Sequence, residues 1–141
     1  MSNAHKIILV DDHKLYREGI SFVISQMDGF EVVGEAESGK AFLEMIDSHD
    51  PDIILMDMFL PDIDGITACL KALDNHPDLK IIAMAMFCEE EYYYDMIKAG
   101  ISGCILKDSG KDEIERSLIK IVSGETYFSG SFIFNTIQNN H

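Results

Sequence analysis

The sequence has few basic residues for its length. It contains 11 Lys and Arg residues against 25 Asp and Glu residues, and its formal net charge at pH 7 is −14. A protein that binds nucleic acid needs a basic face that neutralises phosphate groups. No local basic patch interrupts the acidic balance, so we do not expect this chain itself to bind nucleic acid.

Cysteines and long apolar runs are also scarce. The three cysteines, Cys69, Cys88 and Cys104, have no CxxC spacing, so we expect neither a disulfide framework nor a zinc site. No run approaches the roughly 18 apolar residues of a membrane helix, and no signal-peptide pattern opens the chain. We therefore expect a cytoplasmic protein that does not bind membranes. Residues 1–4 resemble an expression-vector remnant and are excluded from the fold prediction.

Five short apolar runs are present, at residues 7–10, 32–33, 53–56, 81–84 and 104–106. Four of them are nearly continuous, which is typical of strands covered on both faces. The run at 32–33 alternates with charged residues and suits an edge strand. Helical patterns lie between the runs. This alternation predicts a single α/β domain with a doubly wound parallel sheet.

Apolar residues at helical spacing predict where the helices lie. Residues 15–27 are apolar on more than one side. The other stripes are Phe42, Met45 and Ile46; Ile66, Cys69, Leu70 and Leu73; and Ile114, Leu118, Ile121 and Val122. The tail at 125–141 is too short for a second domain, and we expect it to form one more short helix that packs on the body.

Charged residues follow three of the predicted strands. Asp11 and Asp12 follow the first strand, Asp57 follows the third and Lys107 follows the fifth. In such folds, sites form beyond the carboxyl ends of the strands. Three clustered carboxylates repel one another unless a cation compensates, and Mg²⁺ prefers oxygen ligands. An aspartate is also a competent nucleophile for forming an acyl phosphate. The pattern therefore predicts a magnesium-assisted phosphoryl site.

The sequence resembles the receiver domain of bacterial two-component response regulators, within the NarL/LuxR-type group. The matching segments are KIILVDDHKLYREGI (6–20), PDIILMDMFLPDIDGI (51–66), KAGISGCILKD (98–108) and GETYFS (124–129). The resemblance implies a flavodoxin-like (βα)5 fold with a five-stranded sheet in the order 2-1-3-4-5. Residues 6–124 would be the receiver domain. Residues 1–5 would be a leader, and residues 125–141 a tail or the start of a linker to a DNA-binding domain not present in this chain.

The resemblance also implies roles for single residues. Asp57 would accept a phosphoryl group from a sensor histidine kinase, and Lys107 would pair with the phosphoryl oxygens. Asp12 would ligate Mg²⁺ directly, Asp11 largely through water, and Asp57 and the backbone carbonyl of Phe59 would complete the metal site. Pro61 and Gly65 would shape the following loop, in which Asp62 and Asp64 are more plausible as helix caps or solvated groups. His13 marks the group and is given no chemistry. The implied protein is not an enzyme in the ordinary sense, and a homodimer is possible.

Two positions depart from the family pattern. The family has Ser or Thr where this chain has Ala85, and an aromatic residue where it has Cys104. A lost hydrogen bond to a charged phosphoryl group is worth roughly 1.5–3 kcal/mol. We therefore expect weak coupling between phosphorylation and conformational change, or another route of coupling. The resemblance implies that Phe59 and Phe87 flank the mouth of the site, where we expect them to restrict attacking water; ordinary packing is the alternative.

Two other functions compete with the kinase-dependent receiver. A pseudo-receiver would have the same fold and signal without phosphorylation, which Ala85 and Cys104 favour and the retained acidic residues oppose. A phosphohydrolase would use Asp57 as its nucleophile. Such an enzyme needs a second carboxylate just after the nucleophile, and here Met58 and Phe59 follow.

Overall fold

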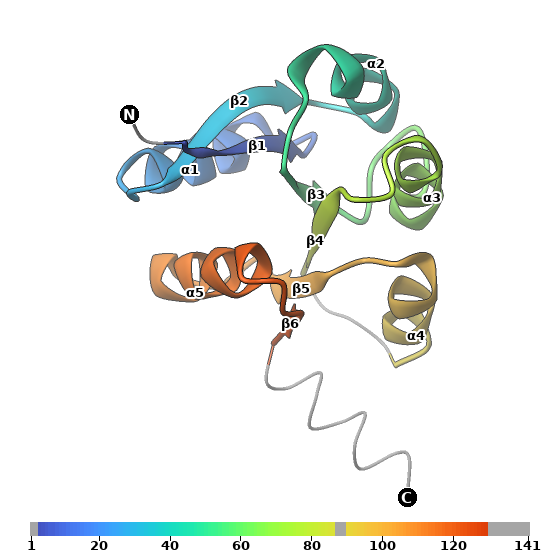
Figure 1. The fold of residues 1–141 in the computed structure, drawn as a ribbon. Helices are drawn as coiled ribbons and strands as arrows, with labels where there is room; N and C mark the ends of the chain where they lie inside the picture. Colours follow the sequence, from blue (N-terminus) through green and yellow to red (C-terminus); the bar gives the residue numbers. More distant parts are fainter. Residues whose placement is uncertain (1–2, 87–89, 130–141) are drawn as a thin grey trace, which may run out of the picture.

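The structure, a computed structural model, describes residues 3–86 and 90–129. Its strands are β1 (His5–Val10), β2 (Phe30–Ala36), β3 (Ile53–Asp57), β4 (Lys80–Ala85), β5 (Gly103–Leu106) and β6 (Tyr127–Phe128). The helices are α1 (Lys14–Ser25), α2 (Gly39–His49), α3 (Gly65–Asn75), α4 (Glu90–Ala99) and α5 (Lys111–Val122). The parallel sheet has the order β2-β1-β3-β4-β5-β6, so the predicted order of five strands is confirmed and a sixth is added (Figure 1).

The strand interior follows the sequence pattern closely. All of β3 is buried, as are the last residues of β1 and β4, which explains their continuous apolar runs. β2 lies at the edge of the sheet and is only partly buried, as its alternation of apolar and charged residues predicts. The register pairs Val10 with Met56 and Asp57 with Met84, so the strands end together at one edge.

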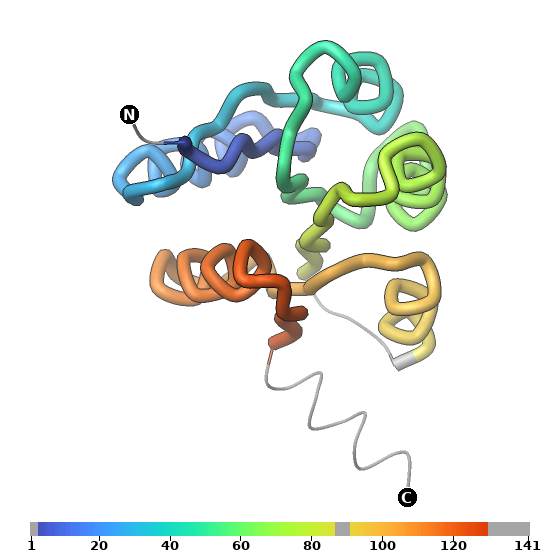
Figure 2. Tube along the Cα trace, viewed as in Figure 1, coloured from blue at the N-terminus to red at the C-terminus, as the bar shows by residue number. Residues whose placement is uncertain are grey.

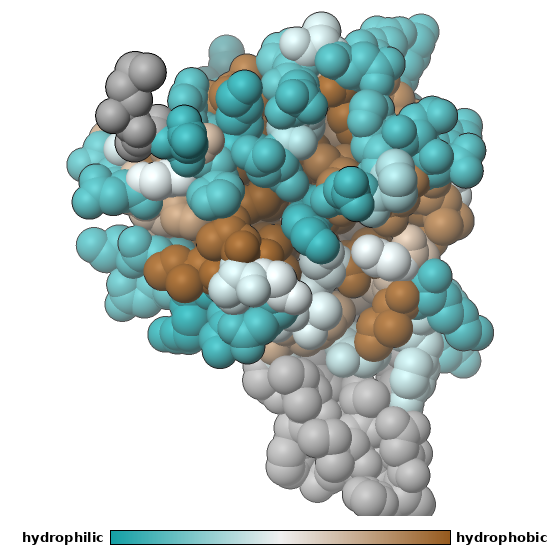
Figure 3. Space-filling model, viewed as in Figure 1, coloured by the Kyte–Doolittle hydropathy of each residue, from teal (hydrophilic) through white to brown (hydrophobic). Residues whose placement is uncertain are grey.

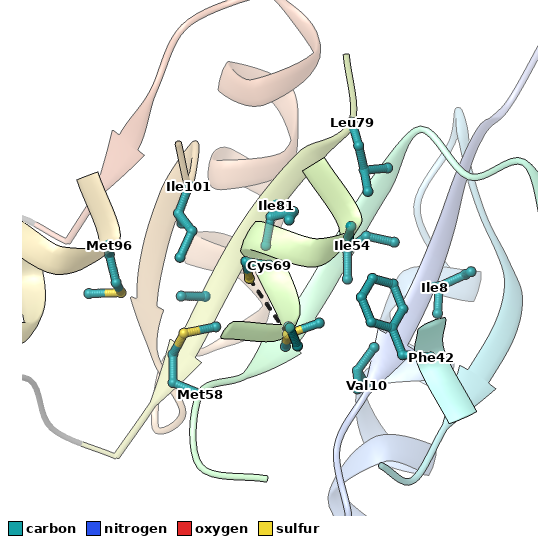
Figure 4. Packing of buried hydrophobic residues seen from close by; sticks show 14 of the residues in the cluster. Ile8, Val10, Phe42, Ile54, Met58, Cys69, Leu79, Ile81, Met96 and Ile101 are labelled. Atoms are coloured by element: carbon teal, nitrogen blue, oxygen red, sulfur yellow. Dashed lines mark hydrogen bonds between the residues drawn. The ribbon is translucent and has the colours of Figure 1, made fainter. Parts of the chain in front are cut away.

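Helices cover both faces of the sheet. α1 and α5 lie on one face, and α2, α3 and α4 lie on the other, as the ribbon and the tube both show (Figures 1 and 2). Each face has its own hydrophobic cluster. The cluster under α2, α3 and α4 includes Phe42, which is fully buried and lies beside Ile8 and Val10 (Figure 4). Burying one such ring contributes about 1.5–3 kcal/mol to folding. The cluster under α1 and α5 includes Ile24 and Leu118.

The apolar stripe that predicted α3 is only partly buried in the structure. Its buried residues are Gly65, Ala68, Cys69 and Ala72, whereas Leu70 is 50% exposed. Small side chains bring the helix close to the sheet, and Cys69 donates to the sulfur of Met56 across this contact at 3.7 Å (Figure 4). The stripe of large apolar residues therefore points partly to solvent. Val122 at the end of α5 is likewise 37% exposed.

The described start of the tail forms a strand and not a helix. Tyr127 and Phe128 form β6, which pairs with Gly103 and Cys104 of β5. A Cβ atom on Gly103 would lie only 2.4 Å from the Tyr127 carbonyl oxygen, so a glycine lets the two backbones approach. A two-residue strand carries too little periodicity to be recognised in a sequence. Residues 130–141 lie outside the described residues.

None of the helices in the described part of the chain is both long and apolar enough to traverse a bilayer.

Candidate functional site

The charged residues predicted at the strand ends meet in the structure. Lys107 Nζ lies 2.7 Å from Asp11 Oδ2 and 3.3 Å from Asp57 Oδ2, so one ammonium contacts two carboxylates. The backbone continues the sheet pairing just beyond the strands, since the Asp11 N–H donates to Ala36 and the Lys107 N–H donates to Ala85. These bonds hold the side chains in place at the carboxyl edge of the sheet.

Burial determines the electrostatics of this cluster. Asp11 is 1% exposed and Asp57 3% exposed. Burial raises the pKa of Asp57, and the Asp11 charge raises it further; the Phe59 N–H and Lys107 oppose this effect without cancelling it. Burial lowers the pKa of Lys107, but the carboxylates of Asp11 and Asp57 outweigh burial and the pKa lies above its usual value. Lys107 is therefore a stable positive charge in the site.

The same cluster has the geometry of a cation site. Ligand atoms of Asp11, Asp12, His13 and Asp57 all lie within 4.8 Å of one another. Asp11 Oδ2 is buried and lies 2.7 Å from Lys107 Nζ. Asp12 is more exposed and opens the cluster to solvent. Mg²⁺ is usually held by one or two carboxylates and retains several waters, so these residues fit it.

The loop after Asp57 is shaped by several hydrogen bonds. The Phe59 N–H donates to Asp57 Oδ1 at 3.0 Å, and Phe59 pairs with Asp64 in an isolated bridge. Asp64 caps α3 by accepting from the Thr67 N–H. A Cβ atom on Gly65 would lie 2.7 Å from the backbone of Met58, so only glycine fits this turn. The metal role of the Phe59 carbonyl stays a prediction.

Asp62 caps a different helix from the one that follows it. Its two carboxylate oxygens accept from the N–H groups of Gly39 and Lys40 at 2.9 Å each, at the start of α2. These hydrogen bonds lower the pKa of Asp62. The loop is thereby tied to α2 as well as to α3, and of the two roles predicted for these aspartates, capping or solvation, both act as caps.

Two residues with contacts in the site were given no role from the sequence. His13 Nδ1 lies 3.1 Å from Asp11 Oδ1 and 3.3 Å from Asp12 Oδ1. Tyr16 lies under Lys107, with Nζ 4.5 Å from the ring centroid, and the Tyr16 hydroxyl donates to the Lys107 carbonyl. Burial, with the charge of Asp11 next in size, raises the pKa of Tyr16 to about 12. Both residues follow the acidic pair at the start of α1, and this closeness in the sequence could have indicated that they contact the site.

The departures from the family pattern lie in the core. Ala85 is the last residue of β4, is 1% exposed and pairs with Leu106 beside the site. Cys104 is fully buried in β5, and its carbonyl accepts from the Ser129 N–H. Neither residue supplies the hydroxyl or the ring of the family pattern.

The predicted gate is described on one side only. Phe59 is 54% exposed, and its ring stacks on the ring of Tyr92 in α4, with centroids 5.7 Å apart. Phe87 lies outside the described residues. The gate formed by the two rings stays a prediction.

The family model described as "Response regulator receiver domain" matches residues 7–119 of this chain. The chain belongs to the response regulator receiver family. The receiver is 36% identical over 124 residues to the response regulator GacA of Pseudomonas syringae, covering 88% of this chain and 58% of that protein. It is 30% identical over 136 residues to the transcriptional regulatory protein DegU of Brevibacillus brevis, covering 96% of this chain and 58% of that protein.

Solved structures place the receiver in the LuxR/NarL group. A LuxR-family two-component response regulator from Aurantimonas sp. has a TM-score of 0.93 at 27% identity, with 98% of this chain and 99% of that chain covered. The receiver domain of NarL from Mycobacterium tuberculosis has a TM-score of 0.80 at 31% identity, with 86% and 98% covered. The receiver spans little more than half the length of the curated relatives it matches.

Proposed function

We propose that this receiver domain accepts a phosphoryl group on Asp57 from a sensor histidine kinase. The observation that supports the proposal best is the position of Lys107 Nζ, which contacts both Asp11 and Asp57. A buried ammonium beside the acceptor carboxylate is placed to pair with phosphoryl oxygens, and ion pairs of this kind are stronger than neutral hydrogen bonds.

In the proposed reaction, an Asp57 carboxylate oxygen attacks phosphorus. The bond between phosphorus and the kinase histidine nitrogen breaks, and the electron pair leaves on nitrogen. The Phe59 N–H holds Asp57 Oδ1, while Lys107 faces Oδ2. Mg²⁺ held by Asp11, Asp12, Asp57 and the Phe59 carbonyl would supply positive charge against the phosphoryl oxygens. Lys107 then pairs with the phosphoryl group that Asp57 carries.

The proposal includes the predicted gate formed by the rings of Phe59 and Phe87. Phe59 follows the acceptor by two residues, and its ring is held by Tyr92. Together with Phe87, the ring would restrict the water that hydrolyses the acyl phosphate. Phe59→Asn should then shorten the lifetime of the phosphorylated protein, measured by intact mass over time. Leu70→Asn, which changes an exposed apolar residue of α3 in the same way, is the control and should leave the lifetime unchanged.

Neither competing function gains support from the site. A pseudo-receiver has no need of a buried carboxylate pair held by a lysine, although Ala85 and Cys104 remain departures from the family. A phosphohydrolase needs a second carboxylate directly after the nucleophile. Met58, which occupies that position, is a buried core residue.

We further propose that the domain controls a transcriptional output segment from the cytoplasm. This rests on family membership and on relatives that are named as transcriptional regulators, which are longer than this chain.

A candidate surface for a homodimer contact lies on α1 and α5. Leu15 and Phe22 on α1 and Ile119 on α5 are exposed, and Figure 3 shows apolar atoms gathered over α5. Because α1 and α5 share one face of the sheet, this face is our candidate for a homodimer contact, which the mass in solution tests.

The test of phosphorylation is direct. The protein is incubated with acetyl phosphate, and its intact mass is measured with Mg²⁺ and with a chelator. We expect one phosphoryl group to be added with Mg²⁺ only, and none in Asp57→Asn. Addition that persists in Asp57→Asn, or no addition to the unchanged protein, would overturn the proposal.

A further inference from the structure

His13 lies at the start of α1, and its side chain contacts the acidic cluster instead of the helix. Its backbone N–H donates to Asp11 Oδ1 at 2.8 Å, and its carbonyl accepts from the Arg17 N–H. His13 occupies the N-cap position, yet its side chain makes no capping hydrogen bond to the helix. The imidazole instead contacts the two carboxylates that precede it, and 68% of the side chain is exposed.

The distances around Nδ1 are close to those between neighbouring ligands of a metal ion. Ligands lie about 2.0–2.2 Å from Mg²⁺ or Zn²⁺, so neighbouring ligands of an octahedral ion are about 2.8–3.1 Å apart. The nitrogen is 3.1 Å from Asp11 Oδ1 and 3.3 Å from Asp12 Oδ1. This nitrogen, the two carboxylate oxygens and an Asp57 oxygen belong to a group of ligand atoms that all lie within 4.8 Å of one another.

We propose that His13 is a nitrogen ligand for a divalent transition-metal ion, such as Mn²⁺ or Zn²⁺, in the acceptor site. This inference deepens the proposed function and rests on it. Imidazole nitrogen suits transition metals, whereas Mg²⁺ prefers oxygen. Mg²⁺ would use oxygen ligands alone, and a transition-metal ion would add His13. The identity of the bound ion then decides whether the His13 side chain coordinates it.

A spectroscopic experiment reads this contact directly. Mn²⁺ is added to the full chain, and electron spin-echo modulation is recorded to detect nitrogen bonded to the ion. We expect an imidazole nitrogen signal that is lost in His13→Ala and kept in His76→Ala. His76 is the matched control because it also pairs with a carboxylate, Asp47, but belongs to the far end of α3.

Calorimetric titration with Mg²⁺ and with Zn²⁺ separates this inference from the proposed function. His13→Ala should weaken Zn²⁺ binding about tenfold or more and change Mg²⁺ binding less than about twofold. Equal losses for both ions, no loss for Zn²⁺, or no nitrogen signal in the unchanged protein would overturn the role of His13 while leaving the magnesium site intact. If the unchanged protein binds neither ion, the metal site of the proposed function fails with it.

Discussion

The ring of Tyr16 lies under the ammonium group of Lys107, and the hydroxyl of the same tyrosine donates to the Lys107 carbonyl at 3.2 Å. A side chain of the first helix thus holds both the charged end and the backbone of a residue that follows the fifth strand. The Lys107 ammonium contacts Asp11 and Asp57 in turn. Tyr16 is therefore a positioning residue for the lysine.

Removing the ring should weaken phosphorylation. A cation–π contact contributes roughly 0.5–2 kcal/mol, so Tyr16→Leu should slow phosphorylation by acetyl phosphate about 2- to 30-fold. Tyr16→Phe keeps the ring and should lose less. In a Lys107→Gln background, Tyr16→Leu should slow phosphorylation less, because the cation–π contact is already absent. An equal loss in both backgrounds would show that the ring acts on something other than Lys107.

Asp57 should reduce the stability of the fold at neutral pH. Its pKa is raised above 3.8 by burial, so the folded state retains a proton that the unfolded chain has already released. Stability contributed by the protonated group is present below pH 3.8 and is lost as the pH rises through the folded pKa. Asp57→Asn should therefore raise the free energy of unfolding at pH 7, and the gain should vanish in acid.

Asp62→Asn is the control with the opposite sign. The pKa of Asp62 is lowered by N–H groups of Lys40 and Gly39, so its stabilisation is present above 3.8 and is lost as the pH falls through the folded pKa. This substitution should lower stability at pH 7. Urea unfolding of both variants across pH measures the two effects, and the same sign for both at pH 7 would contradict the prediction.

Gly65 should not tolerate even a methyl group. A Cβ atom there would lie 2.7 Å from Met58 backbone atoms, so the loop that follows Asp57 must shift. We expect Gly65→Ala to destabilise the protein by about 1–3 kcal/mol, as overpacking does elsewhere. Gly19→Ala is the matched control: a Cβ atom there meets nothing within 4 Å, and the change should stabilise α1 by about 0.5–1 kcal/mol. Urea unfolding of both variants measures the two changes in stability, and equal changes would contradict the prediction.

The sequence was sufficient to predict the cluster of charged residues in the site but not how α3 packs on the sheet. Asp57 and Lys107 could be brought together from the sequence because parallel strands end at the same edge, a rule that needs no side-chain detail. The face of α3 could not be predicted, because Ala68 and Ala72 pack on the sheet by being small while the larger Leu70 lies outside. Periodicity of large apolar residues carries no signal for such packing.

The directions of side chains were the second feature that could not be predicted from the sequence. Tyr16 and His13 stand within six residues of Asp11, but their contacts depend on how α1 leaves the sheet. β6 was missed for a different reason: two residues are too few for any alternation, and the pairing depends on the close approach at Gly103.

Phosphorylation should cause only a weak conformational change in the unchanged protein. Ala85 lies at the end of β4 and supplies no hydroxyl to a phosphoryl group, a bond worth roughly 1.5–3 kcal/mol. Hydrogen exchange across α4, with and without beryllofluoride and Mg²⁺, should change little in the unchanged protein and more in Ala85→Thr. Adding Cys104→Tyr should increase the response further, although the ring must fit a fully buried position.

Ala85→Val is the control for this comparison. Valine matches threonine in shape and has no hydroxyl, so it should respond no more than the unchanged protein. A strong response in the unchanged protein, or equal responses of the valine and threonine variants, would contradict weak coupling through the missing hydroxyl.

The central claim is that Asp57 is the residue that carries the phosphoryl group, and chemical trapping tests it most directly. After incubation with acetyl phosphate and Mg²⁺, borohydride reduces an aspartyl phosphate to homoserine, and peptide mass spectrometry locates it. We predict homoserine at position 57 alone, dependent on Mg²⁺ and much reduced in Lys107→Gln. Homoserine at Asp11, Asp12 or another aspartate with Asp57 unchanged, or no homoserine at all, would contradict it.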